Sequence, residues 1–141
     1  MKVLFYVTLT DQEWKSCSRE FKEVCVNVGE LKISQCPHFY QSMDAMIFPS
    51  LLECFSSMPL ETMFMKKPLF ASDRPFNREI CGPHANYFDP LSPIDAADKI
   101  FNVFSNNYPK LEDLCKAQEH AINFSSPKKR AKKYLDLLNK L

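Results

Sequence analysis

The chain has 141 residues, which is enough for one domain with a hydrophobic core. Its 18 basic residues nearly balance its 17 acidic residues, so we expect no nucleic-acid partner from composition. Hydrophobic residues make up 45% of the chain, which excludes a disordered protein, and no apolar run reaches the roughly 18 residues of a membrane-spanning helix.

Short, nearly all-apolar runs alternate with helical patterns along the chain. Five of these runs read as strands: residues 3–7, 24–28, 45–48, 69–71 and 86–88. Runs that are apolar on both faces are typical of parallel strands covered by helices. The pattern therefore predicts a single doubly wound α/β domain, with a parallel sheet of about five strands and helices on both faces.

The first predicted helix follows the first strand. Thr10 and Glu13 have the spacing of a capping box, in which each side chain bonds the backbone N–H of the other residue. The apolar stripe of this helix is Trp14, Cys17 and Phe21. The sequence thus predicts one amphipathic helix between the first two strands.

Further helix signals occur later in the chain. Ser34 can cap a short helix, and Asp73 can cap another that Gly82 closes. Ser92, which precedes a proline, opens a longer helix with one apolar face. Residues 110–122 read as a further helix.

A last predicted helix begins at Ser126 and Pro127. Its apolar residues, which we expect to face inward, are Ala131, Tyr134, Leu135, Leu138 and Leu141. The basic run at 128–133 is interpreted as the solvated face of this helix. The alternatives for this run are nucleic acid or a weak peripheral contact with an anionic membrane.

Six cysteines are present, and none forms a Cys-x-x-Cys pair. Five lie in or beside apolar segments, so we interpret them as reduced thiols of a cytoplasmic protein, without a metal site. Only two glycines occur, Gly29 and Gly82. Two glycines so far apart exclude the Gly-x-Gly-x-x-Gly dinucleotide-binding loop and the P-loop. A phosphate contact must therefore come from an ordinary helix N-terminus.

Two acids, Glu53 and Glu61, stand eight positions apart after the strand at 45–48. Glu61 falls in the first turn of a predicted helix, so both carboxylates and several free N–H groups lie at the carboxyl end of a strand, where α/β sheets bind ligands. The N–H groups favour phosphate, whereas carboxylates favour hydroxyl groups. A nucleotide sugar carries both kinds of group.

Five segments also match one known pattern in order and spacing. They are Tyr-Gln-Ser-Met-Asp-Ala-Met-Ile-Phe-Pro-Ser at 40–50, Glu-x7-Glu at 53–61, Lys-Pro-Leu-Phe-Ala-Ser-Asp at 67–73, Tyr-Phe-Asp-Pro at 87–90 with Asp-Ala-Ala-Asp-Lys-Ile at 95–100, and Asn-Phe-Ser at 123–125. Together they resemble the C-terminal, donor-binding half of family 4 glycosyltransferases. These are retaining enzymes of the GT-B fold, with two facing Rossmann-like domains.

The resemblance implies a glycosyltransferase that moves a hexose, with retention, from a nucleotide diphosphate sugar to a glycan or glycolipid acceptor, as in polysaccharide biosynthesis. Residues 1–141 would then be a single nucleotide-sugar-binding domain, truncated at its N-terminus and without its acceptor domain. The isolated chain is therefore expected to be inactive. The nucleotide sugar would be a substrate, and no cofactor or metal is expected. The enzyme would be cytoplasmic, with a peripheral membrane location as an alternative.

The resemblance also implies roles for individual residues. Glu53 would contact the transferred sugar as the catalytic candidate, and Glu61 would bind the ribose hydroxyls. Backbone N–H groups for the sugar or phosphate would come from Phe55, Ser56 and Ser57. Gly29 and Glu30 follow the second predicted strand, where the family contacts the nucleobase through its backbone.

The chain departs from the family pattern in two places. Cys54 and Ser56 replace the glycines of Glu-Gly-Phe-Gly, and the basic pair that holds the diphosphate lies upstream of the matched region in the family. Two alternatives therefore stay open. One is a non-catalytic interaction module with the same fold, and the other is half of a sugar-nucleotide epimerase.

Overall fold

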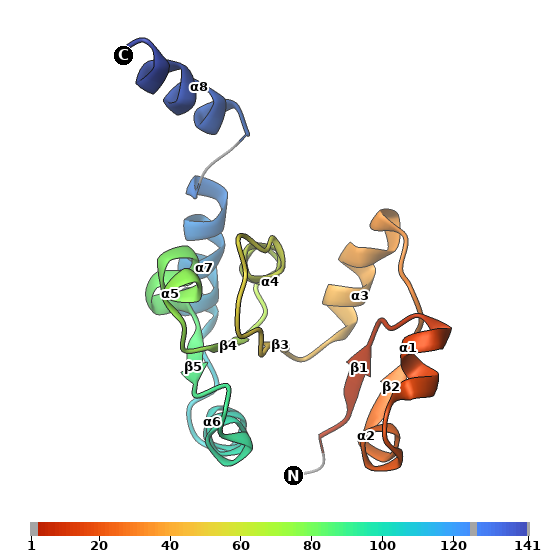
Figure 1. The fold of residues 1–141 in the computed structure, drawn as a ribbon. Coiled ribbons are helices and arrows are strands. Elements are labelled where there is room, and N and C mark those ends of the chain that lie inside the picture. Colours follow the sequence, from red (N-terminus) through yellow and green to blue (C-terminus); the bar gives the residue numbers. More distant parts are fainter. Residues whose placement is uncertain (1–2, 125–126, 141) are drawn as a thin grey trace. The chain divides into compact units, whose positions relative to one another are not determined.

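Strands and helices alternate through the computed structural model, which describes residues 3–124 and 127–140 (Figure 1). The chain divides into two compact units, Met1–Ser42 and Met43–Leu141. Every strand pair in the described residues is parallel, which confirms the predicted α/β class. The five strands hydrogen-bond as two sheets, of two and three strands, rather than as one. Each strand has only three or four residues, so each ladder is short.

The first unit contains the two-stranded sheet. Strand β1 (Phe5–Val7) pairs with β2 (Cys25–Asn27), in the register Phe5 to Cys25 and Val7 to Asn27. The helical elements of this unit are α1 (Asp11–Ser16), α2 (Arg19–Val24), the 3₁₀ turn η1 (Ile33–Gln35) and α3 (Cys36–Ser42). Ser34, which the sequence predicts to cap a short helix, lies inside η1 instead and is not a cap.

The predicted first helix is two helices in the structure. The capping box is confirmed, because Thr10 Oγ1 accepts from the Glu13 N–H at 3.3 Å and Glu13 Oε2 accepts from the Thr10 N–H at 2.8 Å. The backbone then becomes extended at Cys17 and Ser18. Ser18 Oγ accepts from the Phe21 N–H at 3.2 Å and so caps α2. A second N-cap serine therefore interrupts the predicted apolar stripe.

The second unit contains the three-stranded sheet in the order β3 (Met46–Phe48), β4 (Leu69–Ser72) and β5 (Asn86–Phe88). The helical elements of this unit are α4 (Met58–Phe64), α5 (Pro75–Cys81), the 3₁₀ turn η2 (Gly82–His84), α6 (Pro93–Ser105), α7 (Leu111–Asn123) and α8 (Pro127–Leu138). All five predicted strand positions are therefore confirmed, with boundaries that differ by at most two residues.

Side chains of β4 alternate between two cores, one on each face of the sheet. Leu69 and Ala71 enter the first core, and Phe70 enters the second. The first core is completed by Phe48, Met63, Ile80, Cys81 and Ala117, and the second by Phe88 and Val103. Figure 1 shows α4, α5 and α7 on one side of this sheet and α6 on the other. Within this unit, helices thus cover both faces, as predicted.

Helix ends in the second unit agree only in part with the sequence predictions. Gly82 closes α5 with a φ of 53°, a left-handed value that favours glycine, and Ser92 Oγ accepts from the Asp95 N–H at 3.2 Å at the start of α6. The N-cap of α5 is Arg74 instead of Asp73. The Asp73 carboxylate is drawn away because it pairs with Arg78.

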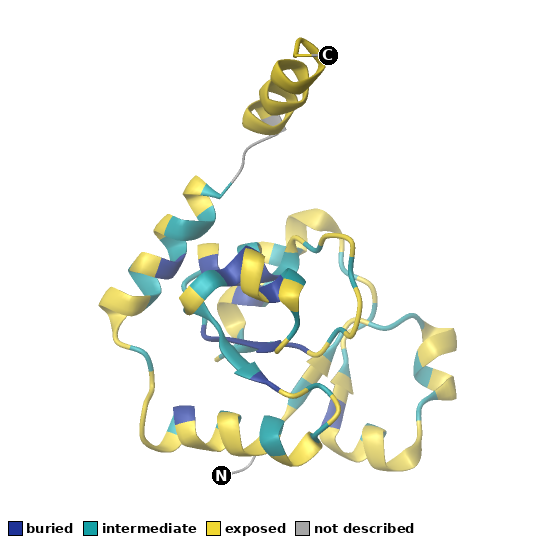
Figure 2. Cartoon of the chain, turned by 60° about the vertical axis from the view of Figure 1, so that its left-hand side comes forward, coloured by how far each residue is buried: buried dark blue, intermediate teal, exposed yellow. Residues whose placement is uncertain are grey.

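The predicted inward face of α8 is not buried. Residues 128–140 are all exposed (Figure 2). Two predicted residues, Ser126 and Leu141, lie outside the described residues. None of the helices within the described residues has the length and apolar character needed to cross a membrane.

Two histidines meet where α7 packs beside η2. The rings of His84 and His120 have their centroids 5.0 Å apart, and His120 Nε2 lies 2.8 Å from the Ile80 carbonyl oxygen, which accepts its hydrogen bond. Burial, and to a lesser extent the neighbouring His120, lower the pKa of His84 below its ordinary value. Protonating His84 is therefore harder in the folded than in the unfolded chain.

We expect stability to fall on acidification through the histidine range. Because the pKa of His84 is lower in the folded chain, the unfolded chain binds more protons than the folded chain below about pH 6.5. The contribution of neutral His84 to stability is therefore complete above that pH and is lost as the pH decreases. Urea unfolding of the parent and of His84→Gln at several pH values measures it. The parent should lose more stability than the variant between neutral pH and about pH 5. Equal losses would contradict this role.

Candidate functional site

The carboxyl ends of β3, β4 and β5 carry a polar network. Ser72, the last residue of β4, donates its hydroxyl to the Ser50 carbonyl oxygen, at the exit of β3. The buried Asn77 of α5 donates Nδ2–H to the Ser72 carbonyl oxygen at 3.0 Å and to Ser72 Oγ at 2.8 Å. The Asp73 N–H donates to the Phe88 carbonyl oxygen at 2.7 Å, across to β5. This network fixes the position from which the 49–57 loop leaves β3.

Glu53 lies on this loop and is held close to the strand end. Its Oε1 accepts the Ser50 hydroxyl at 3.0 Å, and the side chain is only partly exposed. Ser50 therefore links the two ends of the network, since its carbonyl oxygen contacts Ser72 and its hydroxyl contacts Glu53. From the sequence alone Ser50 is only a turn hydroxyl. A carboxylate fixed in this way can accept hydroxyl groups of a ligand.

Glu61 lies in the first turn of α4, as the sequence predicts. Its Oε1 accepts the hydroxyl of Ser57, the N-cap residue, at 2.7 Å, and the residue is exposed. Each of the two acids thus has a serine hydroxyl three or four positions before it as a partner. Both belong to the segment that follows the carboxyl end of β3, so the structure brings them to the same end of the sheet.

The N–H groups of Phe55, Ser56 and Ser57 precede α4. Within the described part of the chain, none of the three donates a hydrogen bond. Ser56 Oγ accepts from the Met58 N–H at 3.4 Å, which fixes the loop just before the helix. The arrangement leaves backbone donors near two carboxylates, which is the combination that a ligand with phosphates and hydroxyls requires.

Phe55 has a further contact that sequence reasoning missed. Its ring stacks on Phe124, with centroids 6.5 Å apart and planes inclined by 23°. The Arg130 guanidinium of α8 lies 5.4 Å from the centroid of the same ring, within cation–π range. Local patterns cannot predict contacts between residues so far apart in sequence. The side chain of Phe55 therefore holds the loop in place, and only the backbone of Phe55 is available to a ligand.

Gly29 and Glu30 belong to the first unit and lie just after β2. Gly29 has a φ of 75°, and its N–H donates to Asn27 Oδ1 at 3.2 Å. The same Asn27 side chain bonds the N–H and carbonyl groups of Leu9, at 2.9 Å and 3.1 Å. The turn is thus tied to the exit of β1, in the left-handed conformation that the glycine permits.

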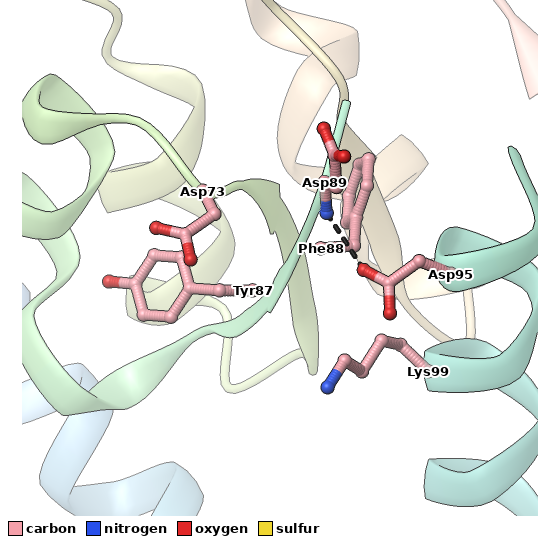
Figure 3. Close-up of a pocket in the computed structure, with 6 residues that line it drawn as sticks. All are labelled: Asp73, Tyr87, Phe88, Asp89, Asp95 and Lys99. Carbon is pink, nitrogen blue, oxygen red and sulfur yellow. Dashed lines mark hydrogen bonds between the residues drawn. The ribbon is translucent and has the colours of Figure 1, made fainter. Parts of the chain in front are cut away.

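A pocket of about 330 Å³ lies at the carboxyl ends of β4 and β5 (Figure 3). Its lining residues are Asp73, Tyr87, Phe88, Asp89, Asp95 and Lys99. Asp95 and Lys99 reach in from α6, and Asp95 Oδ2 accepts from the Asp89 N–H at 2.8 Å. Three carboxylates against one lysine make the pocket better suited to hydroxyl groups than to phosphate.

Two charged or hydroxyl groups of this pocket have structural partners. Bidentate hydrogen bonds from Arg78, one of them 2.7 Å long, hold the pKa of Asp73 below its ordinary value. Tyr87 donates its hydroxyl to the Gly82 carbonyl oxygen at 2.6 Å, and burial raises its pKa to about 12. Tyr87 is therefore unsuited to acid–base chemistry near neutral pH.

Other reactive residue types offer little chemistry. Burial raises the pKa of the Cys81 thiol to about 12, so this cysteine is not an activated nucleophile. Among the residues that the structure describes, no three His, Cys, Asp or Glu side chains are grouped so that they could hold a metal ion.

The sequence profile of the family described as "Glycosyl transferases group 1" matches residues 15–121. No curated protein matches the chain. Among solved structures, a sucrose-phosphate synthase from Thermosynechococcus elongatus is similar, with a TM-score of 0.76 and 14% identity, over 99% of this chain and 38% of that chain. TarM is also similar, with a TM-score of 0.74 and 21% identity, over 97% of this chain and 29% of that chain. This chain thus spans well under half the length of either protein, and the likeness shows the fold.

Proposed function

The chain belongs to the group 1 glycosyl transferases, and we propose that it binds the nucleotide-sugar donor as one part of a longer, retaining family 4 enzyme. The reaction would transfer a hexose from a nucleoside diphosphate to a glycan or glycolipid acceptor. The observation that supports this proposal is the pair Glu53 and Glu61. Both lie after β3, each accepts a serine hydroxyl, and between them lie backbone N–H groups that donate no hydrogen bond to any described residue.

In this proposal the two acids have different partners. Glu61, exposed in the first turn of α4, accepts the ribose hydroxyls. Glu53, fixed by Ser50 at the exit of β3, contacts the transferred sugar. The N–H groups of the loop bind the sugar or the phosphates. The turn at Gly29 and Glu30 contacts the nucleobase through its backbone.

Such a site acts by positioning and by electrostatic stabilisation. The chemical step breaks the bond between the sugar and the diphosphate, so negative charge develops on the leaving diphosphate, and fixed N–H donors stabilise that charge. A carboxylate already held by a hydroxyl group loses little conformational freedom when it receives the sugar. The acceptor-binding site and the remaining catalytic groups would come from parts of the enzyme outside these 141 residues.

Replacing each acid separately tests the assignment. We expect Glu61→Ala to weaken binding of nucleoside diphosphates about tenfold or more, because a hydrogen bond to a charged group contributes about 1.5–3 kcal/mol and 1.4 kcal/mol corresponds to one decade. Glu53→Ala should weaken binding of the nucleotide sugar but not of the free nucleotide. Calorimetric titration with uridine, guanosine and adenosine diphosphates and their sugars measures both effects.

Glu119→Ala is the matched control, since Glu119 is an exposed acid on α7 that makes no hydrogen bond to the 49–57 loop among the described residues. It should bind as the parent does. If a nucleotide binds and both site variants bind it and its sugar like the control, the two acids are structural and the donor-site assignment is wrong.

A further inference from the structure

The Ser50 hydroxyl joins the acid Glu53 to the interior of the protein. Its hydrogen has two acceptors within reach, Glu53 Oε1 at 3.0 Å and the Leu52 carbonyl oxygen at 3.3 Å. A hydroxyl group carries a single hydrogen, and a charged acceptor at the shorter distance binds it more strongly. A carboxylate has about four lone-pair sites, so this one bond leaves others for a ligand. Ser50 therefore restrains Glu53 without blocking it.

The backbone of Ser50 is held in turn by buried side chains of β4 and α5. Ser72 donates its hydroxyl to the Ser50 carbonyl oxygen, and Ser72 and Asn77 are both 0% exposed. Asn77 donates Nδ2–H to Ser72 Oγ at 2.8 Å, so the single hydrogen of the Ser72 hydroxyl is left to point toward Ser50. Three consecutive hydrogen bonds thus lead from the core to the carboxylate of Glu53.

The second acid, Glu61, is held in a different way. Its partner Ser57 is the N-cap of the same helix, and both residues are exposed. A contact between residues one turn apart needs no side chain of β4 or α5. The order of Glu53 therefore depends on the protein interior, whereas the contact of Glu61 with Ser57 depends on the local helix.

We infer that Ser50, Ser72 and Asn77 are positioning residues for the transferred sugar, an inference that rests on the proposed function of Glu53. A carboxylate that is already ordered loses less conformational entropy when it binds a ligand. Releasing Glu53 should therefore weaken the contact with the sugar and leave the contact of Glu61 with the ribose as it is. The preference for a nucleotide sugar over a free nucleotide is thus set by residues that need not touch the donor.

Calorimetric titration of the 141-residue chain with uridine, guanosine and adenosine diphosphates and their glucose conjugates measures this preference. We expect Ser50→Ala to weaken binding of the nucleotide sugar about twofold to tenfold, the fold-change that corresponds to ordering one side chain, and to leave the free nucleotide unaffected. Ser50→Thr keeps the hydroxyl and should bind both like the parent. Ser72→Ala should act in the same direction as Ser50→Ala, because the Ser50 carbonyl oxygen loses its donor.

Two control variants separate positioning from a general loss of stability. Ser42→Ala removes a hydroxyl that also donates to a backbone carbonyl, that of Phe39 at 2.9 Å, and Val103→Ala removes buried methyl groups from the core beside α6. Both should bind the two kinds of ligand like the parent. In a Glu53→Ala background, Ser50→Ala should have no further effect. If Val103→Ala changes the preference as Ser50→Ala does, or if the losses at Ser50 and Glu53 add, the inference is overturned.

NMR relaxation of the Glu53 Cγ methylene group measures the order of this side chain without a ligand. Its order parameter should fall in Ser50→Ala and in Ser72→Ala and recover in Ser50→Thr. An unchanged order parameter in Ser50→Ala would overturn the inference. The inference alone also fails if Glu53→Ala weakens the nucleotide sugar and Ser50→Ala does not. If the order parameter falls but both variants bind every ligand like the parent, the proposed function fails and the restraint of Glu53 by Ser50 stands.

Discussion

Phe70→Ala is expected to lower the free energy of unfolding by about 3–5 kcal/mol, the usual cost of deleting a buried phenylalanine. Phe70 is 1% exposed at the centre of β4 and stacks on Phe104, with ring centroids 6.2 Å apart. It also contributes to the core that joins the three-stranded sheet to α6. Its removal leaves a cavity between a sheet and a helix that cannot close without moving both. Urea or guanidinium unfolding measures the loss.

Phe101→Ala provides the control for this experiment. Phe101 lies on α6, the helix that packs on Phe70, but its side chain is 53% exposed, so its truncation should cost about 1 kcal/mol or less. Similar losses for the two variants would mean that Phe70 does not lie in a tightly packed core. Phe70→Leu keeps most of the volume and should recover much of the stability.

Asn77→Ala is expected to lower the free energy of unfolding by about 2–3 kcal/mol, because a buried acceptor that loses its donor costs about 1–3 kcal/mol and a second hydrogen bond is lost with it. Asn77 is fully buried, and its Nδ2 group serves both the carbonyl oxygen and the hydroxyl of Ser72. Its Oδ1 has no partner among the described residues, so the residue acts as a donor. Chemical denaturation again measures the loss.

A double-mutant cycle isolates this interaction. Ser72→Ala combined with Asn77→Ala should cost less than the two single losses added together, because each single variant already breaks the shared hydrogen bond. Asn102→Ala, at an exposed position of α6, should change stability by about 1 kcal/mol or less. Additive losses at Ser72 and Asn77 would show that the two side chains do not act together.

The sequence predicts best what depends on neighbouring residues. The strand at 86–88 has the predicted bounds because its apolar run ends at Asp89 and Pro90, and the caps formed by Thr10 and Ser92 require only a partner three positions away. The place of Glu53 and Glu61 after β3 follows from the same kind of local order. Backbone hydrogen bonding over short distances therefore explains most of the agreement.

The features that the sequence does not predict are of two kinds. Some depend on contacts between distant residues, and others occur where the local sequence is compatible with two different structures. The bond from Ser72 to Ser50 and the stack of Phe55 on Phe124 join parts of the chain that no periodic pattern relates. At Ser18, a helix that continues and a helix that begins again are both compatible with the local sequence, and the serine cap decides between them. Whether an amphipathic helix is buried depends on the element that it packs against, so the residues of α8 alone do not predict that it is exposed.

The stack of Phe55 on Phe124 also has a consequence for how the protein is made. A ribosome releases the chain from its N-terminus, and units fold as they emerge. The loop between β3 and α4 leaves the ribosome long before Phe124, the residue against which its aromatic ring packs. Strands β3 and β4 can pair earlier, since Leu69–Ser72 follows soon after the loop. The nascent chain can thus hold a paired sheet while this loop is still unanchored, and the loop acquires its final conformation only after α7 has been synthesised.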